Sequence, residues 1–467
     1  SESLSLSRPH TAVMGIAIPI GLAVTTALAM PMVPAVPTRW AALARRLPAS
    51  SAPTPAITLY RDTNGWCPFC ERVWLQLETK GLPYEEVLIN LRDKPQWYKD
   101  MVPTTLVPAV KIRSGGTEEV VWESDVILRR LEELHPEPAM LPPDGERAAA
   151  EALIAEAGNL SSAGFRFAAA VRNASVTQEE VASLRAAFED GLDALDAAIA
   201  EGGGPFLCGG SVGLADATYL PFLERWAVQL PLTSGFALRP EEGEPPRWPQ
   251  IEGWFVAMAE EPAYARVRGD TYSWSAAVAA FQRIFATNGT LTDAQRAVSR
   301  RADGAAALEL RRSAQAAPSA AAALAAAEKI IANWEAVVAD ATAAEPLSQA
   351  NLQRLEEEDG AAVELLLADC AARLLQCAGR WEDEAGGEPA AEGGEEEEEE
   401  RALCEAELLG LEPLEHKVRA DAARLVSARL CAPRDMGADA AEAMRGVLMA
   451  MASESEGLAW RKSGGLL

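Results

Sequence analysis

Between residues 57 and 141, apolar positions follow strand-like spacing in some stretches and helix-like spacing in others. Short apolar runs predict four strands, at 57–60, 84–89, 109–112 and 120–122. A Ser-Gly-Gly sequence separates the last two runs, which favours a hairpin. Apolar positions three and four residues apart predict two helices, at 68–80 and 124–134, with Ser124 as the cap of the second. This order predicts an α/β domain over residues 56–141.

Beyond a Pro-Pro-Asp-Gly linker at 142–145, only helical spacing remains. Residues 147–286 therefore predict an all-helical domain. Residues 290–467 predict a further alanine-rich, all-helical extension, with clear helical stretches at 320–341 and 361–378. Within this extension, the acidic low-complexity run at 382–400 is typical of a solvated, disordered loop.

The first 55 residues differ from the rest of the chain. No acidic residue occurs between Ser3 and Arg61, and an uncharged apolar segment spans residues 13–36. An apolar segment followed by an acid-free stretch rich in Arg, Ser, Ala and Pro favours a two-part targeting sequence, similar to plastid import signals. The alternative is an anchor at 13–36 that associates with a membrane or membrane complex, since ~20 uncharged residues can span a bilayer. We expect a plastid (chloroplast) protein, soluble rather than membrane-anchored.

Charge and cysteine content exclude several function classes. The formal net charge of −27 argues against binding to nucleic acid, which requires a basic face. The seven cysteines are scattered and odd in number, which indicates a reducing compartment rather than a disulfide framework. A zinc site at Cys67 and Cys70 would need two further ligands. Since none of the three histidines lies beside a cysteine, we expect no metal.

The sequence Cys67-Pro68-Phe69-Cys70 predicts a reactive thiol. Proline suits the first turn of a helix, so Cys67 falls at the helix N-terminus, where free N–H groups and the helix dipole favour an anion. We therefore expect the pKa of Cys67 to lie below the ~8.5 of a free cysteine. Cys70, one turn later, is either a resolving thiol or a small buried hydrophobe, and the sequence leaves both open.

Two further features lie where a peptide-like thiol could bind. Val107-Pro108 precedes a predicted strand, and a cis peptide bond there would expose the Val107 backbone, although proline is also common at a strand's first residue. Glu123-Ser124 opens a predicted helix, whose N–H groups can hold a carboxylate, while Glu123 can accept an ammonium group. An ordinary N-cap is the alternative. Together with the Cys67 thiol, these features suit glutathione.

Several motifs resemble one known family. The segments CPFCERVW, KPQWYKDMVPTTLVPAV and ESDVI, in this order, are similar to the thioredoxin-like half of glutathione transferases. The nearest classes are the cysteine-type lambda and omega enzymes and the dehydroascorbate reductases. GLADATYLPFLERW at 213–226 resembles the buried helix of their all-helical half. The resemblance covers about 57–285 and implies a thioredoxin-like α/β domain, then an all-α glutathione-transferase C-terminal domain, before the all-α extension.

The resemblance also implies roles for individual residues. Cys67 would be catalytic. Cys70 stays a candidate catalytic partner on its spacing alone, because many lambda-class members lack a cysteine at this position. The implied glutathione-binding residues are Lys94, Val107, Pro108, Glu123 and Ser124. Among these, Val107 would bind the cysteinyl backbone beside a cis proline, and Glu123 and Ser124 would hold the γ-glutamyl end. Lys94 would lie near the glycine carboxylate, unless it is an ordinary surface lysine. Asp216 would be structural.

We expect an enzyme, a glutathione-dependent thiol transferase or reductase that forms a mixed disulfide at Cys67. Glutathione would be the co-substrate, and a small electrophile or disulfide the second substrate. The alternative is a glutathione-transferase fold that serves as a structural or assembly subunit of a plastid membrane complex, which the apolar segment 13–36 and the unexplained extension suggest. The intact Cys67, Pro108 and Ser124 favour the enzyme. The aromatic stripe Tyr219, Phe222 and Trp226 is typical of a core.

Overall fold

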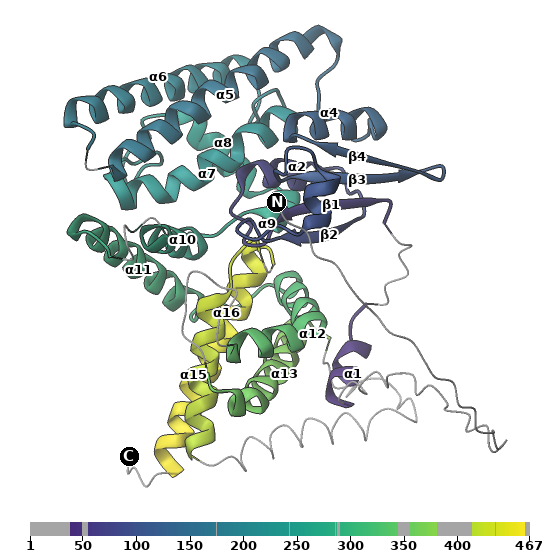
Figure 1. Cartoon of the computed structure of the whole chain (residues 1–467), viewed down its shortest axis with the longest axis vertical. Helices are drawn as coiled ribbons and strands as arrows, with labels where there is room; N and C mark the ends of the chain where they lie inside the picture. Colours follow the sequence, from purple (N-terminus) through teal and green to yellow (C-terminus); the bar gives the residue numbers. More distant parts are fainter. Residues whose placement is uncertain are drawn as a thin grey trace, which may run out of the picture. The chain divides into compact units, whose positions relative to one another are not determined.

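A four-stranded mixed sheet forms the N-terminal domain (Figure 1). Its strands are β1 (Ile57–Asp62), β2 (Tyr84–Ile89), β3 (Ala109–Ser114) and β4 (Thr117–Trp122), in the order β2-β1-β3-β4. β1 is parallel to β2 and antiparallel to β3, while β3 and β4 form the predicted hairpin. The hairpin turn places Gly115 and Gly116 at φ 58° and 84°, which glycine adopts without steric cost. All four predicted strands are confirmed.

The helices of this domain are α2 (Pro68–Thr79), α3 (Gln96–Met101) and α4 (Ser124–Leu134). The predicted helices correspond to α2 and α4, whereas the short α3 was not predicted. One detail is wrong: Ser124 is the first residue of α4, and the N-cap is Glu123, whose side chain makes no capping hydrogen bond. Glu123 has φ 66°, a left-handed conformation that is uncommon outside glycine.

The computed structural model describes residues 38–48, 55–173, 175–241, 243–284, 286, 290–343, 355–380, 413–434 and 436–462. The predicted apolar segment at 13–36 and the predicted disordered loop at 382–400 lie outside these ranges. The described residues from Arg39 onward form one compact unit.

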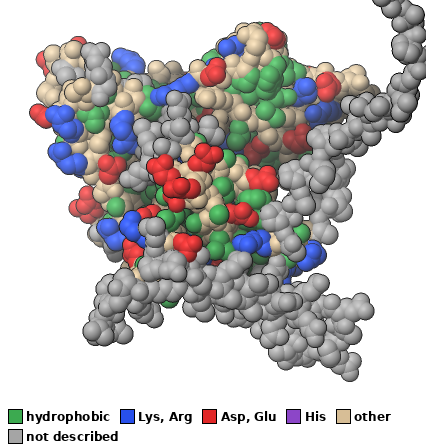
Figure 2. Space-filling model, turned by 60° about the horizontal axis from the view of Figure 1, so that its bottom comes forward, with side chains coloured by type: hydrophobic (Ala, Val, Ile, Leu, Met, Phe, Trp, Pro, Cys, Tyr) green, Lys and Arg blue, Asp and Glu red, His purple; other side chains and the backbone are tan. Residues whose placement is uncertain are grey.

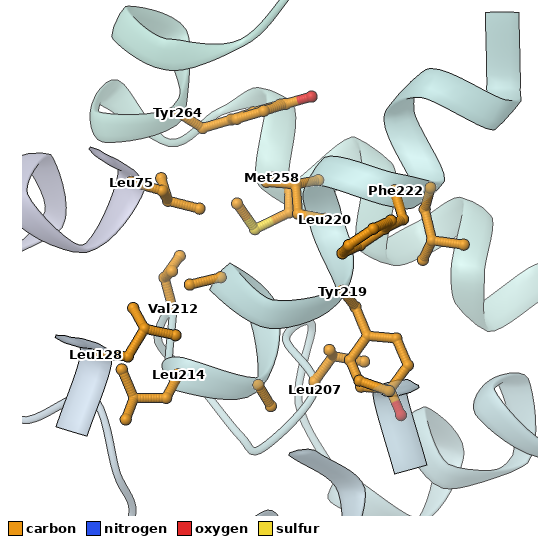
Figure 3. Close-up of a cluster of buried hydrophobic side chains, with 14 of the residues drawn as sticks. Leu75, Leu128, Leu207, Val212, Leu214, Tyr219, Leu220, Phe222, Met258 and Tyr264 are labelled. Carbon is orange, nitrogen blue, oxygen red and sulfur yellow. The ribbon is translucent and has the colours of Figure 1, made fainter. Parts of the chain in front are cut away.

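The second domain is all-helical, as predicted. It consists of α5 (Asp144–Arg172), α6 (Gln178–Gly202), α7 (Leu214–Ser234), α8 (Pro249–Ala259), α9 (Pro262–Val267) and α10 (Thr271–Ile284). The predicted linker is shorter than expected, because α5 already begins at Asp144. Helix α7 is buried on all sides from Leu214 to Trp226, and this stretch includes the aromatic stripe that the sequence assigned to the core. Leu75 of α2 and Leu128 of α4 point toward α7 (Figure 3).

The extension has a core of its own, built largely from alanines. Its helices are α11 (Asp293–Ser313), α12 (Ala320–Thr342), α13 (Gly360–Cys377), α15 (Pro413–Arg429) and α16 (Ala438–Lys462), with a short 3₁₀ turn η1 (Glu357–Asp359). Helix α1 (Thr38–Arg45) belongs to the same core. Its Trp40 is 1% exposed, stacks on Trp334 at 4.8 Å between ring centroids and donates to Glu364.

Buried polar contacts fasten the extension to the rest of the unit. Arg445 of α16 is buried and pairs with Asp270, and it donates to Ser273 Oγ at 3.2 Å. The hydroxyl of Tyr272 donates to the Ala428 carbonyl at 2.8 Å. Because such contacts fix both partners in one orientation, the extension is an integral part of the fold.

The described surface mixes both charge signs. Figure 2 shows basic and acidic side chains interspersed on one face. Among the described helices, none is both long enough and apolar enough to cross a membrane.

Candidate active site

Cys67 lies between the end of β1 and the start of α2. It is the N-cap residue of α2, with proline in the first turn, and its backbone is extended at φ −77° and ψ 114°. The Cys67 side chain is partly exposed, whereas Cys70 is 2% exposed. Of the two residues, Cys67 is thus the more open to solvent, and Cys70 is enclosed in the core.

The two thiols have opposite electrostatic environments. The pKa of Cys67 is lowered, mainly because the Cys70 side chain donates a hydrogen bond to it, with smaller contributions from the backbone N–H groups of Cys70 and Phe69. The pKa of Cys70 is raised well above its ordinary value by burial and by the same hydrogen bond. The direction for Cys67 matches the prediction, but the leading cause is the neighbouring thiol rather than the helix N-terminus.

Asp62, at the end of β1, was not singled out from the sequence. One of its carboxylate oxygens and the two sulfurs all lie within 4.8 Å of one another. The side chain is buried, and its Oδ2 accepts from the Trp66 backbone at 2.8 Å, while Oδ1 has no hydrogen-bond partner among the described residues. The charge of this carboxylate opposes ionisation of both thiols. The three groups can also bind a metal ion, although this described cluster is one ligand short of four-coordinate zinc.

Arg225 of α7 anchors the loop that leads to Cys67. Its Nε donates to Trp66 O at 3.2 Å and its Nη2 to Gly65 O at 3.3 Å. Its Nη1 pairs with Glu71 at 2.7 Å and with Glu224 at 3.1 Å, and all three side chains are buried. One guanidinium thus joins the second domain to the active-site loop. Nothing in the local sequence of α7 indicates this contact.

The first group of residues predicted to bind glutathione comprises Lys94, Val107 and Pro108. The Val107–Pro108 peptide bond is cis, as the resemblance implies, and the Cys67 thiol lies 4.0 Å from the Val107 carbonyl oxygen. Lys94 is partly exposed and donates to Thr105 O at 2.7 Å. Thr105 has φ 56°. Because such backbone conformations cluster at ligand sites, this loop is a credible binding element.

The second predicted group lies at the start of α4. Ser124 is buried, and its Oγ accepts from Arg72 of α2 at 3.4 Å. Glu123 is exposed. Arg72 therefore connects α4 to the helix that Cys67 caps, whereas the structure gives no direct contact from Glu123 or Lys94 to either thiol among the described residues.

Comparison with known proteins identifies the family. Residues 66–134 match the model of the glutathione S-transferase N-terminal domain, and residues 175–257 match that of the C-terminal domain. Glutathione S-transferase DHAR2 of Arabidopsis thaliana is 34% identical over 184 residues, which are 37% of this chain and 78% of that protein. The chain belongs to the glutathione S-transferase family.

Two other relatives are informative. Glutathione S-transferase omega-1 of Mus musculus is 28% identical over 215 residues, which are 46% of this chain and 81% of that protein. Glutathione S-transferase DHAR3, chloroplastic, of Arabidopsis thaliana is 42% identical over 79 residues, which are 17% of this chain and 29% of that protein. None of the three alignments extends over half of this glutathione S-transferase.

Two exposed phenylalanine rings of this glutathione S-transferase meet on α7, and one of them belongs to the first turn after Cys67. Phe69, two residues after Cys67, is 41% exposed, and Phe165 of α5 is 47% exposed. Both rings meet buried Phe222 edge-on, at 5.4 and 5.7 Å between centroids. The Arg72 guanidinium lies over Phe69 and Phe222, and burial lowers its pKa to about 10. Sequence spacing pointed to the buried stripe on α7 but not to the two exposed rings.

Asp216 lies away from the thiols, at the start of α7. It is fully buried and accepts hydrogen bonds from the backbones of Leu207 and Gly213 and from Trp254 Nε1, at 2.7 to 3.0 Å. Burial raises its pKa, which these hydrogen bonds oppose. This geometry supports the structural role that the resemblance implies.

Proposed function

We propose that this glutathione S-transferase is a thiol transferase or reductase that works through a mixed disulfide at Cys67. The Cys67 thiolate attacks the glutathione sulfur of a mixed disulfide, the S–S bond breaks, and the other thiolate leaves and takes up a proton. A second glutathione thiolate then attacks the glutathione sulfur of this Cys67 mixed disulfide, and the bond to the Cys67 sulfur breaks. Oxidised glutathione leaves, and Cys67 returns as a thiolate.

The contrast between the two thiols carries this proposal. Cys67 is the accessible sulfur and has a lowered pKa, while Cys70 is buried and has a raised one. Because thiolates and not thiols are nucleophiles, Cys67 is the sulfur that reacts first. A cysteine at this position favours disulfide exchange over ordinary conjugation.

The surroundings of Cys67 supply both substrate sites. We assign glutathione to the loop with Val107 and cis-Pro108, the N-terminus of α4 with Glu123 and Ser124, and Lys94 for its glycine carboxylate. The exposed rings of Phe69 and Phe165 offer an apolar surface to the second substrate. Dehydroascorbate is a second acceptor for the same chemistry, since it too is reduced by two glutathiones.

Glutathione-dependent reduction of the mixed disulfide between glutathione and 2-mercaptoethanol tests this function on the full chain. We expect Cys67→Ser to abolish turnover with an unchanged circular dichroism spectrum. The matched control is Cys208→Ser, because burial raises the pKa of this partly exposed thiol to about 11 and it should not react. A Cys67→Ser protein that keeps most of its activity contradicts the mechanism. A folded wild-type protein without activity favours the structural-subunit alternative.

We further propose a plastid location. The chloroplastic relative and the acid-free N-terminal stretch support it. Burial of Trp40 in the extension core argues that a removable segment ends before Thr38 and not at residue 55. Mass spectrometry of protein from the native organism should find an N-terminus before Thr38, and a mature start near Ala56 would refute this boundary.

A further inference from the structure

A cavity of about 410 Å³ separates the edge strand β2 from α12 and α15 of the extension. None of the residues that we assign to glutathione lines it. Its volume falls within the roughly 300–1,000 Å³ of pockets that hold small molecules. The cavity depends on the extension, since most of the lining residues belong to it, and neither family model covers that region.

The walls of this cavity are largely apolar. Ile330 of α12, Leu430 and Met444 are buried behind it, and Leu88 of β2 is 46% exposed at its edge. Methionine side chains adapt to ligands of different shapes because they are unbranched and flexible. When an apolar ligand of modest size enters, both the ligand surface and the cavity walls therefore lose contact with water, which favours binding.

The charges around the cavity are positive, although the chain as a whole carries −27. The lining cations are Arg61, Lys329, Arg429 and Arg434, against two carboxylates, Glu86 and Asp340. The carboxylates are already used, because Glu86 pairs with Arg61 at 2.5 Å and Asp340 with Arg429 at 2.8 Å. Lys329 is a further lining cation outside these two pairs.

Lys329 is the cation placed to meet a ligand. It is exposed and has no ion-pair partner in the part of the chain that the structure describes. Asn333 and Ala336, also exposed and also lining the cavity, follow it at intervals of four and three residues along α12. This spacing puts all three on one helix face, so Lys329 stands at the open side of an apolar cavity.

We propose that this cavity binds an amphipathic anion, a monocarboxylate with an apolar body. The carboxylate pairs with Lys329, and the apolar body packs against α12, α15 and Met444. The site is distinct from the proposed active site and does not depend on the proposed function.

The probe for the test is 11-(dansylamino)undecanoate, a fluorescent carboxylate with an apolar chain, titrated against the full-length protein. Ala336→Trp, which fills the cavity from an exposed position, should weaken binding more than about tenfold. Lys329→Glu should weaken it about fivefold, as expected for a partly exposed charge. Arg380→Glu is the matched control, because Arg380 is an exposed cation of the extension that does not line the cavity.

Three further measurements make the result decisive. Saturating glutathione should leave probe binding unchanged, and so should Cys67→Ser. The uncharged methyl ester of the probe should bind more weakly than the acid. Displacement by glutathione would place the probe at the active site, and equal binding of acid and ester would refute the anion. If Ala336→Trp folds by circular dichroism and binds as wild type does, or if Lys329→Glu equals Arg380→Glu, the proposal is wrong.

Discussion

Replacing Arg225 by methionine removes the only guanidinium placed between two buried carboxylates in the described structure. Glu71 and Glu224 lie 2.7 and 3.1 Å from its Nη1. Methionine has a similar length but supplies no charge. The variant also frees the carbonyls of Gly65 and Trp66, so the loop before Cys67 loses its anchor.

The expected loss of stability is large. Removing one partner of a buried ion pair costs about 3–5 kcal/mol, because the remaining charge is left without compensation. The loss should depend on pH. Burial raises the pKa of Glu224 well above its ordinary value, and the neighbouring Glu71 raises it further. A raised carboxyl pKa means that the folded state holds the proton, so stability falls as pH rises from about 4.5 through the folded pKa. Without Arg225 this effect grows.

Thermal unfolding of the full chain measures this prediction. For one cooperative unit of roughly 400 residues, 1 kcal/mol corresponds to roughly 1 °C, so we expect the transition to fall by roughly 3–6 °C at pH 8 and by less at pH 5. The matched control is Arg185→Met. Arg185 is an exposed arginine that pairs with Glu189 one helical turn away at 2.8 Å, and such pairs contribute only about 0.3–0.5 kcal/mol.

Two results would refute the reasoning. If Arg225→Met unfolds within about 1 °C of wild type, the buried carboxylates do not depend on the guanidinium. If the loss is the same at pH 5 and pH 8, their protonation does not relieve it.

Three other predictions follow from the same geometry. Cys70→Ala should raise the pKa of Cys67, because it deletes the main hydrogen-bond donor to that sulfur, whereas Cys70→Ser keeps a donor and most glutathione-dependent activity. The rate of iodoacetamide alkylation measured against pH should differ between the two variants, and identical profiles would contradict the role of Cys70 as donor. Asp216→Ala leaves three buried donors unpaired and should cost about 3 kcal/mol or more, visible as a lower unfolding temperature; an unchanged temperature would remove its structural role. Glu224→Gln should flatten the decline of unfolding temperature between pH 5 and 9, and an unaltered slope would exclude Glu224 as its source.

Local sequence patterns were sufficient to predict many helices and strands of this protein and its reactive cysteine. Strands and helices of the first domain followed from spacing of two and 3.6 residues, since that periodicity is a property of neighbouring residues. The Cys-Pro-Phe-Cys motif identified the accessible thiol for the same reason, because a proline in the first turn and the helix start are both local. The short helix α3 was missed. The cap of α4 was also missed, since Glu123 adopts a backbone conformation that its residue type does not favour.

The sequence alone did not predict contacts between segments that lie far apart in the chain. Arg225 lies 159 residues from the Trp66 carbonyl that it holds, and no spacing rule relates two such positions. Likewise, Trp40 lies in the core of the extension, although the sequence around it resembles a targeting segment. Periodicity determines which face of an element is apolar, but packing alone determines which charge, ring or cavity that face meets.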